Sequence, residues 1–389
     1  MDVIVLLLII GISMHKAIKI ILIISLTVLF SLLISCQKEN KIGSINNLSD
    51  VRIIENKINR LKPLLVPDTT QNNTIDHSVS TFCFVPPNFI YYLDRYKKKI
   101  YVIVSTNGKE ILSFSRPGRG PGEFKNVNLI RYFPDGMISV LDNSLRRITL
   151  FDKRGNVKQT IHTPYPLSDI AFMPNGKLLL SSFELIPNYK PLKILSINDE
   201  KIFSEFGFII DPQVKLTERL NFSSFTKINR SLYSSMGMVK ILLLPNSKDI
   251  IYSQKHPYYL LKYNIETKNF FRFDTKLPYS TDLMDEIIMD EKKESTTFID
   301  HPSARIMAPK CLNNLILIPI FSAGSQNNFL DCYSIDGKFV KRLRIPSLDK
   351  GLEAWIVDIS PALEIFVLVS APNHFYWIER FQIDPTVFN

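Results

Sequence analysis

The stretch Arg116 to Phe124 reads Arg-Pro-Gly-Arg-Gly-Pro-Gly-Glu-Phe, and the rest of the chain is interpreted outward from it. Three of the 14 glycines of the chain and two of its prolines lie in this stretch. Glycine adopts backbone angles that other residues avoid and proline fixes its own, so no helix or strand is expected to cross it. Short apolar runs broken by turn residues lie on both sides. We therefore interpret the stretch as a loop that joins two β units and name it the signature loop.

The sequence around the signature loop shows one pattern in six copies. Each copy has a turn, an apolar strand, a polar gap, a second strand with aromatic or branched residues, a tight turn and a third strand. In copy two these are Pro134-Asp135-Gly136, strands at 137–141 and 147–151, Arg154-Gly155-Asn156 and a strand at 157–161. An apolar run before the first turn makes four strands a copy. Successive copies lie 40 to about 70 residues apart, the period of propeller blades.

A four-stranded antiparallel meander buries little apolar surface by itself, so the copies are expected to pack side by side around an axis. Copy six reaches its third strand at 376–383, and the residues that remain are too few for a normal fourth strand. Because an unpaired sheet edge is a liability, Val51–Ile54 or Leu61–Val66 is predicted to supply that outer strand.

The predicted fold is an all-β, six-bladed β-propeller of four-stranded antiparallel blades, with the ring closed by an N-terminal strand. The alternative is a large β-sandwich with coincidentally regular turns.

The signature loop also carries a resemblance. Gly-Arg-Gly-Pro-Gly-Glu-Phe (118–124) after a strand, with Asp-Gly and Asn-Gly turns around it, resembles the blade-to-blade loop of NHL-like six-bladed β-propellers. It is similar in particular to the propeller lipoproteins abundant in Bacteroidetes, often labelled TolB-like or 6-bladed beta-propeller. That family is defined by its fold, and most members have no established activity. The resemblance therefore implies an architecture rather than a chemistry.

The N-terminus has the features of an export signal. Residues Ile20 to Ile34 form an apolar run that follows Lys16 and Lys19 and precedes Ser35-Cys36, the pattern of a secretory signal. Leu-Ile-Ser-Cys resembles a lipobox, in which Cys36 becomes the lipidated first residue. The alternative is a single transmembrane helix, although the run is shorter than the ~20 residues that a bilayer requires.

These features predict the domain organisation and the location. Residues 1–35 are the signal peptide, with 1–13 interpreted as a start-site error, 36–50 are a lipid-anchored tether, and 51–389 are the propeller. Gln37 after the cysteine favours the outer membrane. Lys38-Glu39 resembles a weak form of the signal that sends Bacteroidetes lipoproteins to the cell surface, so both a periplasmic and a surface orientation stay open.

The chain is basic, with a formal net charge of +10. Loss of residues 1–35 removes Lys16, Lys19 and Asp2, which leaves 45 basic and 36 acidic residues, a balance of +9. This excess favours anionic partners such as lipopolysaccharide or acidic glycans, or else consists of scattered surface lysines. Because the sequence has no long Lys/Arg run or RNA-binding motif, no nucleic-acid partner is predicted.

Candidate binding residues lie in the links between blades. In a meander the blade-to-blade links lie at one face with the links between strands two and three, so binding sites are expected there. The signature loop contributes Arg116, Arg119 and Glu123, and the 207–238 link contributes Arg219 and Arg230. The 276–310 link has apolar residues at amphipathic spacing in an acidic run, which predicts a short helix that caps this face or docks a partner.

The three charged residues of the signature loop allow two interpretations. They form an anion-binding or partner-contacting cluster, helped by backbone N–H groups beside the glycines. Alternatively, the Glu123 carboxylate caps the loop amides and the arginines are solvated.

No catalytic residue, metal ligand or cofactor is predicted. The histidines are scattered, and the sequence has no Gly-X-Ser-X-Gly elbow, phosphate-binding loop or Rossmann fingerprint. Some six-bladed propellers are calcium lactonases or zinc lyases whose ligands come from first strands, but the corresponding strands here are mostly apolar. Of the cysteines after Cys36, Cys311 and Cys332 lie in copy five, and whether they pair is open.

The predicted function is a lipid-anchored, non-catalytic propeller that binds a protein or anionic glycan at the outer membrane. The alternative is a calcium- or zinc-dependent hydrolase or lyase with its site in the central channel.

Overall fold

The structure is a computed structural model of the whole chain, in which Val51–Asn389 form one compact unit. The described residues are 53–65, 79–94, 96–174, 176–182, 190–207, 239–254, 259–273, 286–290, 295–299, 304–322, 328–349, 351–371 and 376–388.

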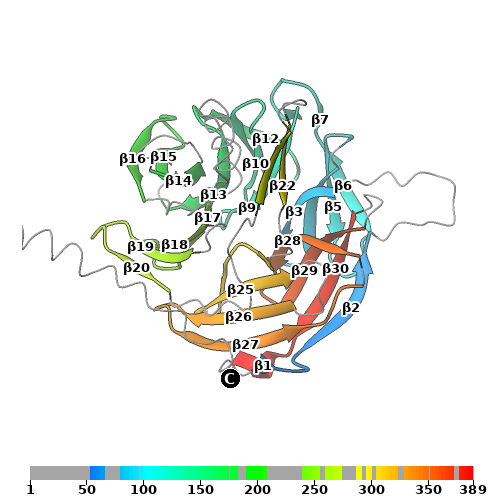
Figure 1. The fold of residues 1–389 in the computed structure, drawn as a ribbon. Helices are drawn as coiled ribbons and strands as arrows, with labels where there is room; N and C mark the ends of the chain where they lie inside the picture. Colours follow the sequence, from blue (N-terminus) through cyan, green and yellow to red (C-terminus); the bar gives the residue numbers. More distant parts are fainter. Residues whose placement is uncertain are drawn as a thin grey trace, which may run out of the picture. The chain divides into compact units, whose positions relative to one another are not determined.

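Six blades, each built on antiparallel strands, follow one another in chain order around a ring (Figure 1). The first three blades are β3–β6 (Val79–Val85, Phe89–Asp94, Lys99–Val104, Glu110–Phe114), β9–β12 (Val127–Tyr132, Ile138–Asp142, Arg147–Phe151, Val157–His162) and β13–β16 (Leu167–Met173, Lys177–Ser182, Leu192–Ser196, Ile202–Phe206). The fourth is β17–β20 (Val239–Leu243, Asp249–Gln254, Tyr259–Asn264, Phe270–Arg272). Each is a four-stranded meander, as the repeat pattern predicted.

The last two blades take strands from both ends of the chain. In blade five, β23 (Ala304–Ile306) and β24 (Lys310–Leu312) both pair with β25 (Leu315–Ser322), which is followed by β26 (Asn328–Ser334) and β27 (Phe339–Ile345). Blade six has β28 (Glu353–Ile359), β29 (Glu364–Ser370) and β30 (Tyr376–Ile383), and its fourth strand is β2 (Ile58–Leu64) from the N-terminus. The six-bladed propeller is therefore confirmed, and the sandwich alternative is wrong.

The predicted closure of the ring is confirmed by the register of β2. It runs antiparallel to β30, with Ile58 opposite Ile383 and Leu64 opposite Ile378. Arg60 on β2 also makes two hydrogen bonds of 2.9 Å to the Glu379 carboxylate, whose side chain is 2% exposed. A second N-terminal strand, β1 (Ile53–Ile54), pairs parallel with β27 in blade five.

The blades are joined by clusters of buried apolar side chains, each shared by two neighbours. Strand β3 shows why: successive side chains of a strand point to opposite faces, so one strand can serve two clusters. Phe82 and Phe84 lie in a cluster with Phe366 of blade six, whereas Cys83 lies in a cluster with Val127 of blade two. The cluster of blades six and one completes the ring, since the other five join blades one to six in sequence.

The tight turns between strands three and four contain glycines because a neighbouring blade packs closely against them. Gly155, with a φ of 83°, lies so close to blade one that an added Cβ would be 2.5 Å from Cγ of Phe114. Gly337 has the same relation to Phe271 of blade four. A turn glycine therefore lets an outer-strand phenylalanine of the preceding blade pack against the next blade.

The prediction of a helix in the 276–310 link is wrong. This segment contains β21 (Glu286–Asp290) and β22 (Ser295–Ile299), which pair antiparallel as a separate two-stranded sheet. The apolar residues at 283, 284, 287 and 288 have helical spacing, which led to the prediction. Strands are favoured instead by the β-branched residues Ile287 and Ile288 and by the run Ser-Thr-Thr-Phe-Ile at 295–299.

Candidate functional site

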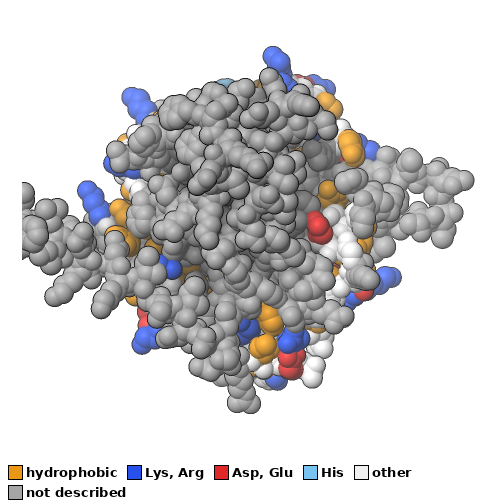
Figure 2. Space-filling view, in the orientation of Figure 1, with side chains coloured by type: hydrophobic (Ala, Val, Ile, Leu, Met, Phe, Trp, Pro, Cys, Tyr) orange, Lys and Arg blue, Asp and Glu red, His pale blue; other side chains and the backbone are white. Residues whose placement is uncertain are grey.

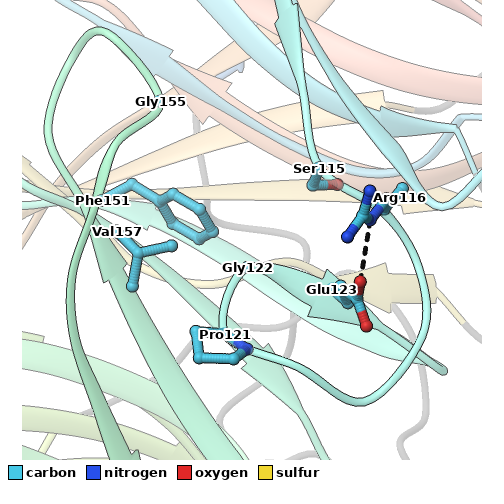
Figure 3. Close-up of a pocket in the computed structure, with 8 residues that line it drawn as sticks. All are labelled: Ser115, Arg116, Pro121, Gly122, Glu123, Phe151, Gly155 and Val157. Carbon is cyan, nitrogen blue, oxygen red and sulfur yellow. Dashed lines mark hydrogen bonds and ion pairs between the residues drawn. The ribbon is translucent and has the colours of Figure 1, made fainter.

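The signature loop is organised around the carboxylate of Glu123. Its Oε2 accepts hydrogen bonds from the backbone N–H groups of Arg119 at 3.0 Å and Gly120 at 2.8 Å. Its Oε1 accepts one from Nε of Arg116 at 2.8 Å, the dashed contact in Figure 3. Of the two interpretations of this loop, the structure shows Glu123 capping the loop amides.

Gly118 allows this arrangement. Its φ of 154° is unfavourable for other residues, and an added Cβ would be 2.1 Å from Oε2 of Glu123. Two short parallel strands, β7 (Arg116–Pro117) and β8 (Glu123–Phe124), close the base of the loop. The glycine therefore leaves the space that the carboxylate occupies.

Two buried residues of blade two hold the loop in place. The Arg147 guanidinium donates to the carbonyl oxygens of Arg119 at 2.7 Å and Gly120 at 2.8 Å, and also to that of Glu123. Oδ2 of Asp142 accepts from the N–H groups that follow the loop, those of Lys125 at 2.7 Å and Asn126 at 3.0 Å.

Asp142 and Arg147 flank the β10–β11 connection, which links strands two and three of blade two. The expectation that a blade-to-blade link lies beside such a connection is thus confirmed for the signature loop. Sequence reasoning missed both residues. Their signal was a carboxylate and a guanidinium at the ends of adjacent apolar strands.

The contacts of Glu123 also fix its charge. The hydrogen bond from the Gly120 N–H, and then the one from Arg116, lower the pKa of the Glu123 carboxyl below its ordinary value. The carboxylate is therefore ionised at neutral pH and cannot act as a general acid there.

A shallow pocket of about 290 Å³ lies between the signature loop and the outer strands of blade two (Figure 3). Its lining residues are Ser115, Arg116, Pro121, Gly122, Glu123, Phe151, Gly155 and Val157. Figure 3 shows Phe151, Val157 and Pro121 on one side and the Arg116–Glu123 pair on the other. The Ser115 hydroxyl donates to the carbonyl oxygen of Lys98 at 2.7 Å, so it is already engaged. The pocket thus offers an apolar wall beside a guanidinium that is 76% exposed.

The inner strands, which were predicted to be mostly apolar, also carry charged residues. Asp169 on β13 accepts from the Arg131 guanidinium of blade two at 2.8 Å and from the Ile241 N–H of blade four at 3.2 Å. The Asp358 carboxylate on β28 repeats this arrangement, with Nζ of Lys310 of blade five at 2.6 Å and the Phe84 N–H of blade one at 2.9 Å.

Each of these carboxylates therefore binds a cation of the preceding blade and a backbone N–H of the following one. Burial opposes the charge of Arg131, but Asp169 and Asp358 outweigh it and raise the pKa of the guanidinium. These groups hold neighbouring inner strands together. In the part of the chain that is described, no three His, Cys, Asp or Glu side chains are grouped as metal ligands.

These features agree with the result of a family comparison. The model of DUF5128, described as a 6-bladed beta-propeller, matches residues 64–301, more than half of the chain. The chain belongs to this 6-bladed beta-propeller family. The resemblance inferred from the signature loop is thereby confirmed.

Solved structures similar to this 6-bladed beta-propeller include two from Bacteroides. A Bacteroides vulgatus member of the duf4221 family has 10% identity and a TM-score of 0.52, over 84% of this chain and 99% of that one. A Bacteroides fragilis protein with the description "Putative exported protein" has 9% identity and a TM-score of 0.50, over 84% of this chain and 95% of that one. At these identities the similarity is one of fold. A search of curated proteins found no match.

The other predicted residues have different outcomes. Cys36, Arg219 and Arg230 lie outside the described residues, so their roles stay predictions. Cys83, Cys311 and Cys332 are free thiols, and burial raises the pKa of each.

Two surface properties complete the description. In the face drawn in Figure 2, the described Lys and Arg side chains that are visible lie at separate points around the edge. Among the described residues, none belongs to a helix with the length and apolar character needed to span a bilayer.

Proposed function

We propose that this propeller is a lipid-anchored binding protein of the bacterial outer membrane, and that it acts without catalysis. The observation that carries the proposal is the chemistry of the signature-loop pocket. The ionisable groups that line the pocket are Arg116 and the ionised Glu123, which form a hydrogen-bonded ion pair. The hydroxyl of Ser115, which also lines the pocket, donates to the carbonyl oxygen of Lys98. This lining supplies no proton-transfer pair, whereas a guanidinium beside an apolar wall suits recognition of an anionic group.

The export and anchoring part rests on the N-terminus. An apolar run with basic residues before it ends at Leu-Ile-Ser-Cys36, the pattern of a lipoprotein signal. The fold neighbour from Bacteroides fragilis, which is described as exported, supports the same compartment. Gln37 favours the outer membrane as the destination.

The ligand or partner is proposed to contact Arg116 and Arg119. Both side chains are exposed, and their loop is held rigidly by Asp142 and Arg147. A preorganised loop loses little entropy on binding, which favours affinity for a small contact area. An acidic glycan or an acidic protein segment has the chemistry that this surface would recognise.

The test is a binding experiment with a matched control. Protein purified from native membranes would be assayed against acidic and neutral glycans, comparing wild type with Arg119→Glu and with Lys201→Glu, an exposed lysine on blade three. The proposal predicts binding of an acidic glycan, or capture of an acidic partner, that Arg119→Glu abolishes and Lys201→Glu does not. Equal loss in both variants would leave net charge as the explanation. Stoichiometric calcium or zinc in the purified protein would instead favour the hydrolase or lyase alternative.

A further inference from the structure

Exposed apolar side chains gather at the outer rim of blades four and five. Of eight large hydrophobic side chains that are exposed among the described residues, four lie here. They are Phe270 and Phe271 on β20, exposed by 58% and 50%, and Ile335 and Val340 on either side of the β26–β27 turn, exposed by 39% and 45%. We name these four residues the rim patch.

Contacts between the two blades make the rim patch continuous. The Phe271 ring lies over the turn glycine Gly337, where an added Cβ would be 2.5 Å from Cε1 of the ring. Nζ of Lys262, on the strand beside β20, donates to the carbonyl oxygen of Ile335 at 3.2 Å. The blade-four and blade-five halves of the patch are thus held against each other.

The charges around the rim patch are mainly positive. The segments 262–272 and 335–341 contain five basic residues, Lys262, Lys268, Arg272, Lys338 and Lys341, and two acidic ones, Glu266 and Asp336. The Asp249 carboxylate pairs with Lys262 at 3.0 Å, so the local balance with Asp249 included is +2. Lys338 is 84% exposed. Aromatic side chains among lysines and arginines are the composition of surfaces that bind anionic membranes.

The direction of β1 places the rim patch near the point where the chain enters the propeller. Because β1 is parallel to β27, with Ile53 opposite Arg342, its N-terminal end points toward the β26–β27 turn that carries Ile335. Ile53 also packs against the cluster that contains Phe273 and Tyr333 of the same two blades. Ile53 follows Cys36 by 17 residues, which span at most about 60 Å.

We propose that the rim patch rests on the anionic surface of the membrane that anchors the protein. The inference rests on the proposed lipid anchor for its geometry, since an anchor at Cys36 keeps this rim within reach of the bilayer. The phenylalanines enter the interface between headgroups and acyl chains, and the lysines contact anionic headgroups. The propeller would then stand with blades four and five against the membrane.

The test uses the chain from Gln37 onward, which lacks the lipid and retains every described residue. Its co-sedimentation with vesicles of phosphatidylglycerol and phosphatidylethanolamine would be compared with that on phosphatidylcholine vesicles. The variants are Phe270→Ser/Ile335→Ser and, as control, Phe203→Ser, which removes a phenylalanine 59% exposed on the outer strand of blade three. A cooperative thermal transition would verify that each variant is folded.

The expected result is binding to the anionic vesicles that falls roughly ten-fold or more in Phe270→Ser/Ile335→Ser and is unchanged in Phe203→Ser, with weaker binding to phosphatidylcholine. Failure of the wild-type chain to bind anionic vesicles would overturn the proposal and favour a protein partner at this rim. An equal loss in Phe203→Ser would overturn it as well. Because the chain carries no lipid, these outcomes are independent of whether Cys36 is acylated.

Discussion

Replacing Ile58 and Leu64 with alanine is expected to open the propeller at its closing strand. Ile58 is 3% exposed in the cluster of blades five and six, and Leu64 is 4% exposed in the cluster of blades six and one. Each truncation of a buried aliphatic side chain costs about 2–5 kcal/mol. The two residues lie in different clusters, so the two costs of about 2–5 kcal/mol should add to about 4–10 kcal/mol. That is a large part of the roughly 5–15 kcal/mol by which a domain is stable.

The assay is urea unfolding followed by tryptophan fluorescence and far-ultraviolet circular dichroism. Both tryptophans of the chain, Trp355 on β28 and Trp377 on β30, lie in blade six, so fluorescence reports the blade that β2 completes. A closed ring predicts that both signals change together and that the double variant unfolds at much lower urea, if it folds. The control Asn59→Ala/Lys62→Ala alters exposed positions of the same strand and should change the stability by less than about 1 kcal/mol.

Two truncations test the same claim without a cavity. Removal of residues 40–66 should destabilise the whole propeller, whereas removal of 40–48 should leave its unfolding unchanged. The reasoning is refuted if Ile58→Ala/Leu64→Ala unfolds at the same urea concentration as its control, or if fluorescence changes well before the circular dichroism.

Three further predictions follow from the loops and turns. Glu123→Gln should lower the stability at neutral pH. Because the pKa of Glu123 is depressed in the folded protein, the difference in stability from wild type should shrink below about pH 4.5 and vanish in stronger acid. A difference that does not depend on pH would count against the capping role. Gly155→Ala should lower the free energy of unfolding in urea by about 2–4 kcal/mol, because the alanine adds backbone strain and a clash with Phe114. Gly176→Ala should lower it by about 1–2 kcal/mol, because Gly176 has a φ of 64° but open space for a Cβ. Equal costs would contradict the packing argument. A short Gly/Ser linker in place of residues 282–294 removes β21, whose strand partner is β22 in a sheet separate from the blades, so no blade loses a strand pairing and thermal melting should stay cooperative. Loss of the folded state would show that the link is part of the core.

Much of the fold could be predicted because blades depend on local signals. Turn residues such as Asp336-Gly337 recur at a fixed phase with apolar strands between them, and the short last copy led to the prediction of an N-terminal strand at its edge, where β2 lies. The 286–299 hairpin could not be assigned in this way. The apolar residues at 283, 284, 287 and 288 have helical spacing, whereas residues 286–290 form a strand by pairing with Ser295–Ile299.

The candidate site was predictable only in part. The sequence identified Arg116, Arg119 and Glu123, because glycines and charges in one loop stand out. It did not identify Asp142 and Arg147, which act on the loop from a different strand pair, or the Asp169 and Asp358 contacts between blades. Such contacts depend on how one blade is placed against the next, which a period in the sequence does not specify.

The most direct test of the proposed membrane-anchored role is mass spectrometry of the mature N-terminus. Protein purified from native outer membranes should yield an N-terminal peptide that begins at Cys36 and carries acyl chains, and Cys36→Ala should give soluble protein or an uncleaved precursor. An N-terminal peptide that begins elsewhere without a lipid, or a processed Cys36→Ala protein that still fractionates with membranes, would contradict the account.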